Sequence, residues 1–291
     1  MKIRISAITD VGKERTNNED TVLVCPDLEK QHWGEMESKD YIPLSKYGAM
    51  LVVADGMGGA NAGEIASSIA VNTVKNYFSQ NRLSEDRLSE KTAHRMLGEA
   101  IALSNKAIME YAKTEPDSIG LGTTIVITWI VEDSAYIAWC GDSRCYSYNQ
   151  INGLQLLTKD HSYVQELIDK GKIAPNQAFN HPDSNIVTKC LGDVDASTEP
   201  DILTYQLNDG DLLLTCSDGL CGYCDDKSIE KVLLKSFDNL SACKDNLLKL
   251  AMAAGGQDNI TIALCATLPE DQQAPIVTAY TKIKRFIKNM V

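Results

Sequence analysis

The chain has 291 residues, of which 44% are apolar and 23% charged, and this composition is typical of a globular protein with a sizeable core. Its formal net charge of -12 argues against a nucleic-acid-binding protein, because such proteins present positive charge to phosphates. No stretch approaches the roughly 18 to 20 consecutive apolar residues of a membrane span, and the first residues alternate as in a strand instead of forming a secretory leader, so we expect a cytoplasmic protein.

The first part of the chain predicts two strands followed by two helices. Ile3, Ile5 and Ala7 alternate with polar residues, which predicts a half-buried strand over residues 2–9. The polar segment 25–46 has no sustained period and predicts a long loop, and the apolar run 49–54 predicts a central strand. Apolar residues at helical spacing over 63–77 and 97–108 predict two amphipathic helices, the second ending near Pro116.

The second part predicts more strands than helices. Runs of β-branched and aromatic residues at 123–131 and 135–140 predict a hairpin, which the run 144–148 extends. A short helix is expected over 162–170, and the irregular segment 171–200 is long enough to be functional. Strands 202–207 and 211–216 are expected to pair across the turn 208–210, before helices at 228–235 and 243–253 and a last strand at 260–267.

This order of elements predicts an α+β fold, with a central β-sandwich of two mainly antiparallel sheets flanked by α-helices. The composition changes after residue 268, so we expect one domain over residues 1–268 and a tail over residues 269–291. The end of the tail alternates basic and apolar residues, which predicts a helix. That helix either makes weak contact with an anionic surface or, as we favour, docks on its own domain.

Four aspartates stand where an apolar run meets a glycine or a turn. Any one of them is explained by a turn, because aspartate side chains bond to nearby backbone amides. Four together, with two more acids near the N-terminus, predict that several anions are aimed at one point, which is stable only if cations occupy it. Donors that are all oxygen favour manganese or magnesium over zinc. The residues concerned are Glu19, Asp20, Asp55, Asp142, Asp218 and Asp258.

Arg15 lies four residues before Glu19. Taken alone it is best explained as a surface arginine in a solvated salt bridge. Beside a carboxylate-bound pair of metal ions, however, a guanidinium is well suited to grip a phosphate group, because its planar fork matches two phosphate oxygens. We therefore predict that Arg15 binds phosphate.

A set of short motifs in a fixed order carries a resemblance to a known family. The chain resembles the metal-dependent protein phosphatases of the protein phosphatase 2C type, in their bacterial branch, over about residues 5–266. The resemblance implies hydrolysis of phosphoserine and phosphothreonine in phosphoproteins, and a cognate Ser/Thr kinase that this activity opposes. The motifs are 15–20 (RTNNED), 53–59 (VADGMGG), 122–124 (GTT), 141–144 (GDSR), 160–162 (DHS), 217–220 (SDGL) and 256–261 (GQDNIT).

The resemblance also implies a centre of two Mn²⁺ or Mg²⁺ ions and direct attack on phosphorus by a metal-activated water, with no phosphoenzyme intermediate. Arg15 would bind the substrate phosphate, and Asp55 would bridge both ions. One ion would take the Gly56 carbonyl and, partly through water, Glu19 and Asp20. The other would take Asp218 and Asp258, and Asp142 would share a weaker third ion with Asp218. The implied catalytic set is Arg15, Asp55, Asp218 and Asp258.

Two positions depart from the family pattern. Met57 stands where the animal branch has a histidine proposed as the general acid, so the proton for the leaving group must come from water or another group. Gly222 stands where some members supply a further aspartate to the third metal, which leaves third-site affinity open. His161 is a candidate acid, but we disfavour it because its motif lies in a structural segment. The segment 171–200 aligns with the family's flap, where substrate choice is expected. His181 in this segment either touches phosphopeptide or metal-bound water, or lies in a solvated loop.

Two alternative functions remain open. The chain could regulate by binding a partner with little catalysis, or it could be a calcium-stabilised acidic binding module, although the calcium ligands of such a module usually cluster in one loop.

The nine cysteines favour free thiols over a disulfide framework. Cys221 and Cys224 have C-x-x-C spacing, and we favour structural thiols over a redox pair or half of a zinc site. Their closeness to Asp218 nevertheless predicts modest inhibition by peroxide that dithiothreitol restores.

Overall fold

The computed structural model describes residues 1–58, 62–81, 88–115, 120–193 and 198–268, so the predicted tail lies outside the described residues. Two antiparallel sheets form the centre of the molecule. The first has the order β3 (Ile42–Pro43), β1 (Lys2–Asp10), β12 (Ile260–Leu268), β11 (Leu212–Cys216), β8 (Arg144–Asn149) and β9 (Gly153–Leu156). The second has the order β10 (Asp201–Gln206), β7 (Ser134–Cys140), β6 (Ile125–Val131), β4 (Ala49–Met57) and β2 (Asp20–Cys25), and β5 (Gly122–Thr123) pairs with the end of β4.

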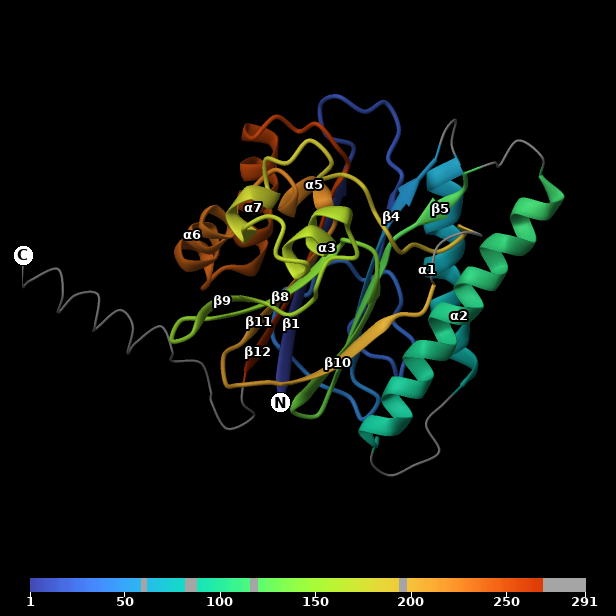
Figure 1. Cartoon of the computed structure of the whole chain (residues 1–291). Helices are drawn as coiled ribbons and strands as arrows, with labels where there is room; N and C mark the ends of the chain where they lie inside the picture. Colours follow the sequence, from blue (N-terminus) through green and yellow to red (C-terminus); the bar gives the residue numbers. More distant parts are fainter. Residues whose placement is uncertain (59–61, 82–87, 116–119, 194–197, 269–291) are drawn as a thin grey trace, which may run out of the picture.

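The sheets pack face to face and helices cover their outer faces. Strands β6, β11 and β12 are buried along their whole length, which requires a partner layer on each side of the sheet. Figure 1 shows α1 (Ala62–Gln80) and α2 (Glu90–Thr114) on one side of the sandwich, and α6 (Asp226–Ser236) and α7 (Leu240–Ala253) on the other. The predicted α+β sandwich is therefore confirmed.

Three apolar clusters correspond to these layers. The central cluster joins the inner faces of the two sheets, for example Leu51 and Val126 from one sheet with Ile5 and Leu213 from the other. A second cluster lies between α1, α2 and their sheet, and a third lies between α6, α7 and the other sheet. Burial of apolar surface on both faces of each sheet is the main stabilising term of this architecture.

Side-chain caps fix where several helices begin. The Ser89 side chain accepts a hydrogen bond from the Thr92 N–H before α2, and Ser162 caps α3 (Tyr163–Asp169) by accepting from Gln165 N–H. Asp225 and Asn239 cap α6 and α7 in the same manner. Two further helices, α4 (Pro175–Ala178) and α5 (Asp218–Cys221), are a single turn each. Among the described residues, no helix has the length and apolar character needed to cross a membrane.

Two predicted pairings are wrong, and in both cases the chain changes sheets. Strand β10 pairs with β7, whereas β11 pairs with β8 and β12 in the other sheet. The Asp211 carboxylate accepts hydrogen bonds from the Asn208 N–H at 2.7 Å and the Tyr205 hydroxyl at 3.0 Å, which shapes the turn that carries the chain across. Strand β2 was not predicted at all.

Strand β8 likewise does not extend the hairpin of β6 and β7, because it belongs to the opposite sheet. The chain crosses over at Gly141, Asp142 and Ser143. Gly141 has φ +121°, and a Cβ there would lie 2.5 Å from the Cβ of Thr124, so only glycine fits this crossing. The crossing places the Asp142 carboxylate at the end of the sandwich where β4 and β11 also end.

Candidate metal and phosphate site

A cleft with about 230 Å³ of space opens at this end of the sandwich. Most of the acidic residues singled out from the sequence line it, and Asp20 lies buried in β2 directly opposite Asp55 in the strand register. The structure therefore brings together side chains that are spread over most of the chain. The lining residues are Arg15, Glu19, Asp55, Gly56, Met57, Gly58, Thr124, Asp142, Asn185, Val187, Asp218 and Asp258.

Asp20 and Asp55 are facing carboxylates on neighbouring strands. Burial, followed by the charge of Asp20, raises the pKa of Asp55 well above its usual value. Burial also raises the pKa of Asp20 to about 7, although the Ser217 hydroxyl donates a hydrogen bond to it at 2.7 Å and opposes the shift. Two like charges in this position disfavour ionisation unless a cation lies beside them.

Asp218 and Asp142 add further negative charge from other elements. Asp218 is the first residue of α5, immediately after β11, and burial and the Asp258 carboxylate raise its pKa to about 6. Burial and the charge of Asp218 raise the pKa of Asp142 well above its usual value. Mutual repulsion therefore affects every buried acid of the cleft in the same direction.

The donor set of the cleft fits divalent cations. Asp20 Oδ1 and Asp218 Oδ1 are buried without a hydrogen-bond partner, and a buried carboxylate oxygen without a donor is a natural ligand for a hard cation. All donors are oxygens, which suits Mn²⁺ or Mg²⁺. Within the described ranges, however, no three acidic, histidine or cysteine side chains stand close enough to hold an ion as placed. The acids that line the cleft are therefore candidate ligands by their chemistry.

Arg15 is the only cation among the described residues that line the cleft. Its Nη2 lies 2.8 Å from Asp258 Oδ2, and 52% of its side chain is exposed. Burial opposes the shift, but the Asp258 carboxylate raises the pKa of Arg15, so the guanidinium stays charged. A permanent positive charge at the rim of an acidic cleft can hold a substrate phosphate that the acids alone would repel.

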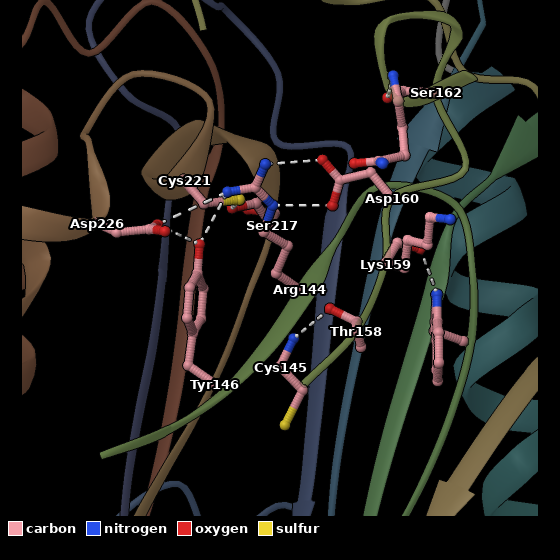
Figure 2. A network of polar contacts seen from close by, with 12 residues as sticks. Arg144, Cys145, Tyr146, Thr158, Lys159, Asp160, Ser162, Ser217, Cys221 and Asp226 are labelled. Carbon is pink, nitrogen blue, oxygen red and sulfur yellow. Dashed lines mark hydrogen bonds and ion pairs between the residues drawn. The ribbon is translucent and has the colours of Figure 1, made fainter. Parts of the chain in front are cut away.

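The segment 157–162, which follows β9, contacts the residues next to the turn that carries Asp142. Arg144 follows this turn and pairs with both oxygens of Asp160, at 2.8 Å and 2.7 Å, as Figure 2 shows. Its Nη1 also donates to the Tyr146 hydroxyl at 2.9 Å and lies 3.8 Å from Asp226 of α6. These contacts connect β8, the segment 157–162 and α6 beside the cleft.

His161 does not line the cleft but contacts a turn that does. Its Nδ1 accepts a hydrogen bond from the Gly141 N–H at 3.0 Å, and its ring stacks on Trp139 with a centroid separation of 6.1 Å. Its Nε2 lies 3.4 Å from Asp201, and burial, the largest cause, lowers its pKa. His161 therefore holds the turn before Asp142, which agrees with the structural assignment favoured from the sequence.

The flap contributes residues that sequence reasoning missed. Asn185 and Val187 line the cleft, whereas His181, singled out from the sequence, accepts a hydrogen bond from the Asp183 N–H within its own turn. A bridge between Ser162 and Val187 sets which flap residues face the cleft. No local sequence pattern reveals such a bridge. Ser217 and Asn259, which bond to Asp20 and to the Glu19 N–H, were missed as well.

Comparison with known proteins extends these observations. A family model described as protein phosphatase 2C matches residues 38–253. The serine/threonine phosphatase stp of Listeria welshimeri is 37% identical over 256 residues, which cover 88% of this chain and 92% of the relative. The solved S. agalactiae serine/threonine phosphatase superposes with a TM-score of 0.76 at 33% identity, covering 90% of this chain and 98% of that one.

A crystal structure of the catalytic domain of the serine threonine protein phosphatase PstP, in complex with 2 manganese ions, superposes with a TM-score of 0.73 at 27% identity. The alignment covers 92% of this chain and 99% of that one. The family model and these relatives together span both sheets and the cleft between their ends. The chain belongs to the protein phosphatase 2C family, in its bacterial branch.

Proposed function

We propose that the protein hydrolyses phosphoserine and phosphothreonine in phosphoproteins with divalent metal ions in the cleft, in the cytoplasm and in opposition to a Ser/Thr kinase. The observation that carries this proposal is one cleft in which carboxylates from separate parts of the chain surround a single arginine. The names of the bacterial relatives, which are serine/threonine phosphatases, support the same activity. Metal dependence agrees with the manganese complex of the related PstP domain.

Two ions and a weaker third are assigned to the acids of the cleft. Asp55 would be a ligand common to the first two ions, and Asp142 with Asp218 would hold the third. Bound ions would supply a water acidified for attack on phosphorus and positive charge for the phosphoryl oxygens, without a phosphoenzyme. The Gly56 carbonyl and, partly through water, Glu19 and Asp20 would hold one ion, and Asp218 and Asp258 would hold the other.

The chain's own residues orient the substrate and hold the ligands in place. Arg15 binds the phosphoryl group at the rim, since it is permanently charged and half exposed. The Thr124 hydroxyl accepts a hydrogen bond from the Asp55 N–H at 3.2 Å, and the Thr123 hydroxyl donates to the Asp55 carbonyl at 2.9 Å. Met57 lines the cleft but cannot donate a proton, so the proton for the leaving group comes from water or from another group.

A phosphothreonine-peptide assay in the presence of Mn²⁺ tests the proposal. We expect phosphate release by the natural chain and a loss of roughly 100-fold or more in Asp218→Asn, because removing a charged group that acts on the transition state costs several kcal/mol. Asp209→Asn is the matched control, since Asp209 is an exposed turn residue outside the cleft. It should keep full activity.

Equal phosphate release by the natural chain and Asp218→Asn would contradict the enzyme assignment. Stabilisation by metal without any turnover would instead favour a regulator or a calcium-binding module. Residues 1–268 are proposed as the catalytic domain, because the family match over residues 38–253 and all the residues that line the cleft lie within them. A chain ending at Leu268 should therefore hydrolyse the peptide at the rate of the full chain.

A further inference from the structure

The segment that carries Arg15 and Glu19 has no helix or strand of its own. We call residues 11–19 the site loop. It is docked on the segment before β12, where the Lys13 N–H donates to the Gly256 carbonyl at 2.7 Å. Gly12 has φ +78°, and a Cβ there would lie 2.2 Å from the Asp258 carbonyl oxygen, so the two backbones are in close contact. The position of Arg15 therefore depends on how this loop is held.

One buried side chain holds both ends of the site loop. Asn259 is 5% exposed, and its Oδ1 accepts a hydrogen bond from the Glu19 N–H at 2.7 Å. Its Nδ2 donates to the Asn17 carbonyl at 2.9 Å and to the Val11 carbonyl at 3.0 Å. These three bonds use the amide oxygen and both amide hydrogens. All of them end on main-chain atoms, so they fix the path of the loop whatever its side chains do.

Further contacts hold the Glu19 end of the site loop. The Glu19 carbonyl accepts hydrogen bonds from the Ser67 hydroxyl at 2.6 Å and the Gly56 N–H at 3.1 Å. Arg15 lies between the ends, and with half of its side chain exposed it is placed by the loop backbone more than by packing. Since Asn259 directly follows Asp258, the same short segment positions the guanidinium and the carboxylate that contacts it.

We propose that Asn259 is a positioning residue for phosphate recognition, which acts by clamping the site loop so that the Arg15 guanidinium faces the cleft. The inference rests on the proposed function, because it takes Arg15 as the group that binds the substrate phosphate. Asn259 itself touches neither phosphate nor the reacting atoms. Its removal leaves the Val11 and Asn17 carbonyls without their donor, and the loop then samples positions in which Arg15 misses the phosphate.

A purely structural asparagine provides the matched control. Asn149, at the end of β8, is 8% exposed, and its Nδ2 donates to Asp211 Oδ1 at 2.9 Å. Its Oδ1 accepts from the Ile151 N–H at 2.9 Å. Asn149 is thus as buried and as fully bonded as Asn259, but it does not line or support the cleft. Asn149→Ala should cost stability without changing phosphate binding.

The experiment measures the affinity for inorganic phosphate in two ways on the Mn²⁺-loaded full chain. One is the inhibition constant of phosphate against hydrolysis of p-nitrophenyl phosphate. The other is the rise in unfolding temperature that phosphate produces, which needs no turnover. We expect Asn259→Ala to weaken phosphate binding about tenfold, within the range for residues of one hydrogen-bond network, and Asn149→Ala to change it less than about twofold.

A double-mutant cycle with Arg15 separates a positioning role from a structural one. In an Arg15→Ala background, Asn259→Ala should weaken phosphate binding by less than about twofold further, because the group that it positions is gone. An equal loss in both backgrounds, or an equal loss in Asn149→Ala, would overturn the proposal. Should Asn259→Ala fail to fold, Asn259→Asp takes its place, because it keeps the acceptor for the Glu19 N–H and loses both donors. Its phosphate binding is then compared in the two Arg15 backgrounds and with Asn149→Ala in the same way.

The wild-type control keeps the two hypotheses apart. A natural chain that binds phosphate but hydrolyses no phosphopeptide contradicts the proposed function, while the binding measurements still decide the role of Asn259. A natural chain that hydrolyses phosphopeptide while Asn259→Ala binds phosphate normally contradicts the positioning role alone.

Discussion

Cys221 and Cys224, the thiols that closely follow Asp218 in the sequence, are in surroundings that suppress their reactivity. They are 3% and 4% exposed. A hydrogen bond with Cys216, followed by burial, raises the pKa of Cys221 well above its usual value, and burial raises the pKa of Cys224 to about 11. Because the thiolate is the form that reacts with peroxide, the structure argues against the inhibition expected from sequence proximity.

We therefore predict that millimolar peroxide changes phosphatase activity little, and equally in the natural chain and in a Cys221→Ser, Cys224→Ser double variant. The measurement is the rate of peptide dephosphorylation before and after peroxide treatment, with dithiothreitol added to a parallel sample. Inhibition of the natural chain that dithiothreitol reverses and the double variant lacks would show that these thiols are reactive after all.

At the scale of residues, sequence reasoning found the chemistry of the site but not its supports. The acids and Arg15 stand in short motifs, and the structure places them around one cleft or directly behind it. Two supports act through contacts between residues far apart in the sequence: Asn259 bonds to the Glu19 N–H, 240 positions away, and Ser217 bonds to Asp20, 197 positions away. Ser217 and Asn259 stand in the motifs 217–220 and 256–261, but the motifs do not reveal which atoms they contact, because those contacts exist only after folding.

At the scale of elements, the Arg144–Asp160 pair joins β8 to the segment that leads into the flap (Figure 2). We predict that Arg144→Met lowers the free energy of unfolding by about 2 kcal/mol or more. Loss of a buried partner typically costs about 3 to 5 kcal/mol, and a side chain that is 23% exposed costs less. Chemical denaturation measures the change. Adding Asp160→Leu should recover part of it, since no carboxylate is then left unpaired.

If Arg144→Met unfolds at the denaturant concentration of the natural chain, the pair contributes only as a surface ion pair does. Lys170→Met is a suitable control, because Lys170 pairs with Glu166 on exposed α3 at 2.8 Å with 57% of its side chain exposed. Lys170→Met should change the free energy of unfolding by no more than about 0.5 kcal/mol.

The positions of the strands were predicted more reliably than the pairing between them. The strands β4, β6, β7 and β12 were predicted from runs of apolar, β-branched and aromatic residues, since strands covered on both faces are continuously apolar. Pairing failed where the chain crosses between sheets, after β7 and after β10. In the sequence both crossings resemble hairpin turns. Only the packing of the second sheet decides whether the next strand pairs with the preceding one or joins the opposite sheet.

At the scale of the whole molecule, the acids of the cleft make stability depend on pH and metal. The pKa of Asp20 is raised to about 7 and that of Asp218 to about 6, mainly by burial. A carboxyl group with a raised folded pKa contributes stability below its unfolded pKa and loses it as pH rises through the folded value. In chelator, we therefore predict a higher unfolding temperature at pH 5 than at pH 8.

Mn²⁺ should raise the unfolding temperature more at pH 8 than at pH 5, because ionised carboxylates bind the cation and protonated ones do not. Thermal unfolding at both pH values, with chelator and with Mn²⁺, measures the effect. A metal-free protein that is more stable at pH 8 would show that the acids of the cleft are not the groups that set its pH dependence. Asp218→Asn should reduce the difference between the two pH values.

The position of β12 has a consequence for how the protein is made. This strand lies between β1 and β11, and it pairs Leu268 with Lys2 in a single register. A ribosome adds roughly 5 to 20 residues per second, so β1 must wait many seconds for its neighbour to leave the exit tunnel. Because Asp258 precedes the same strand, a nascent chain that stalls before it lacks both a central strand of one sheet and an acid of the cleft.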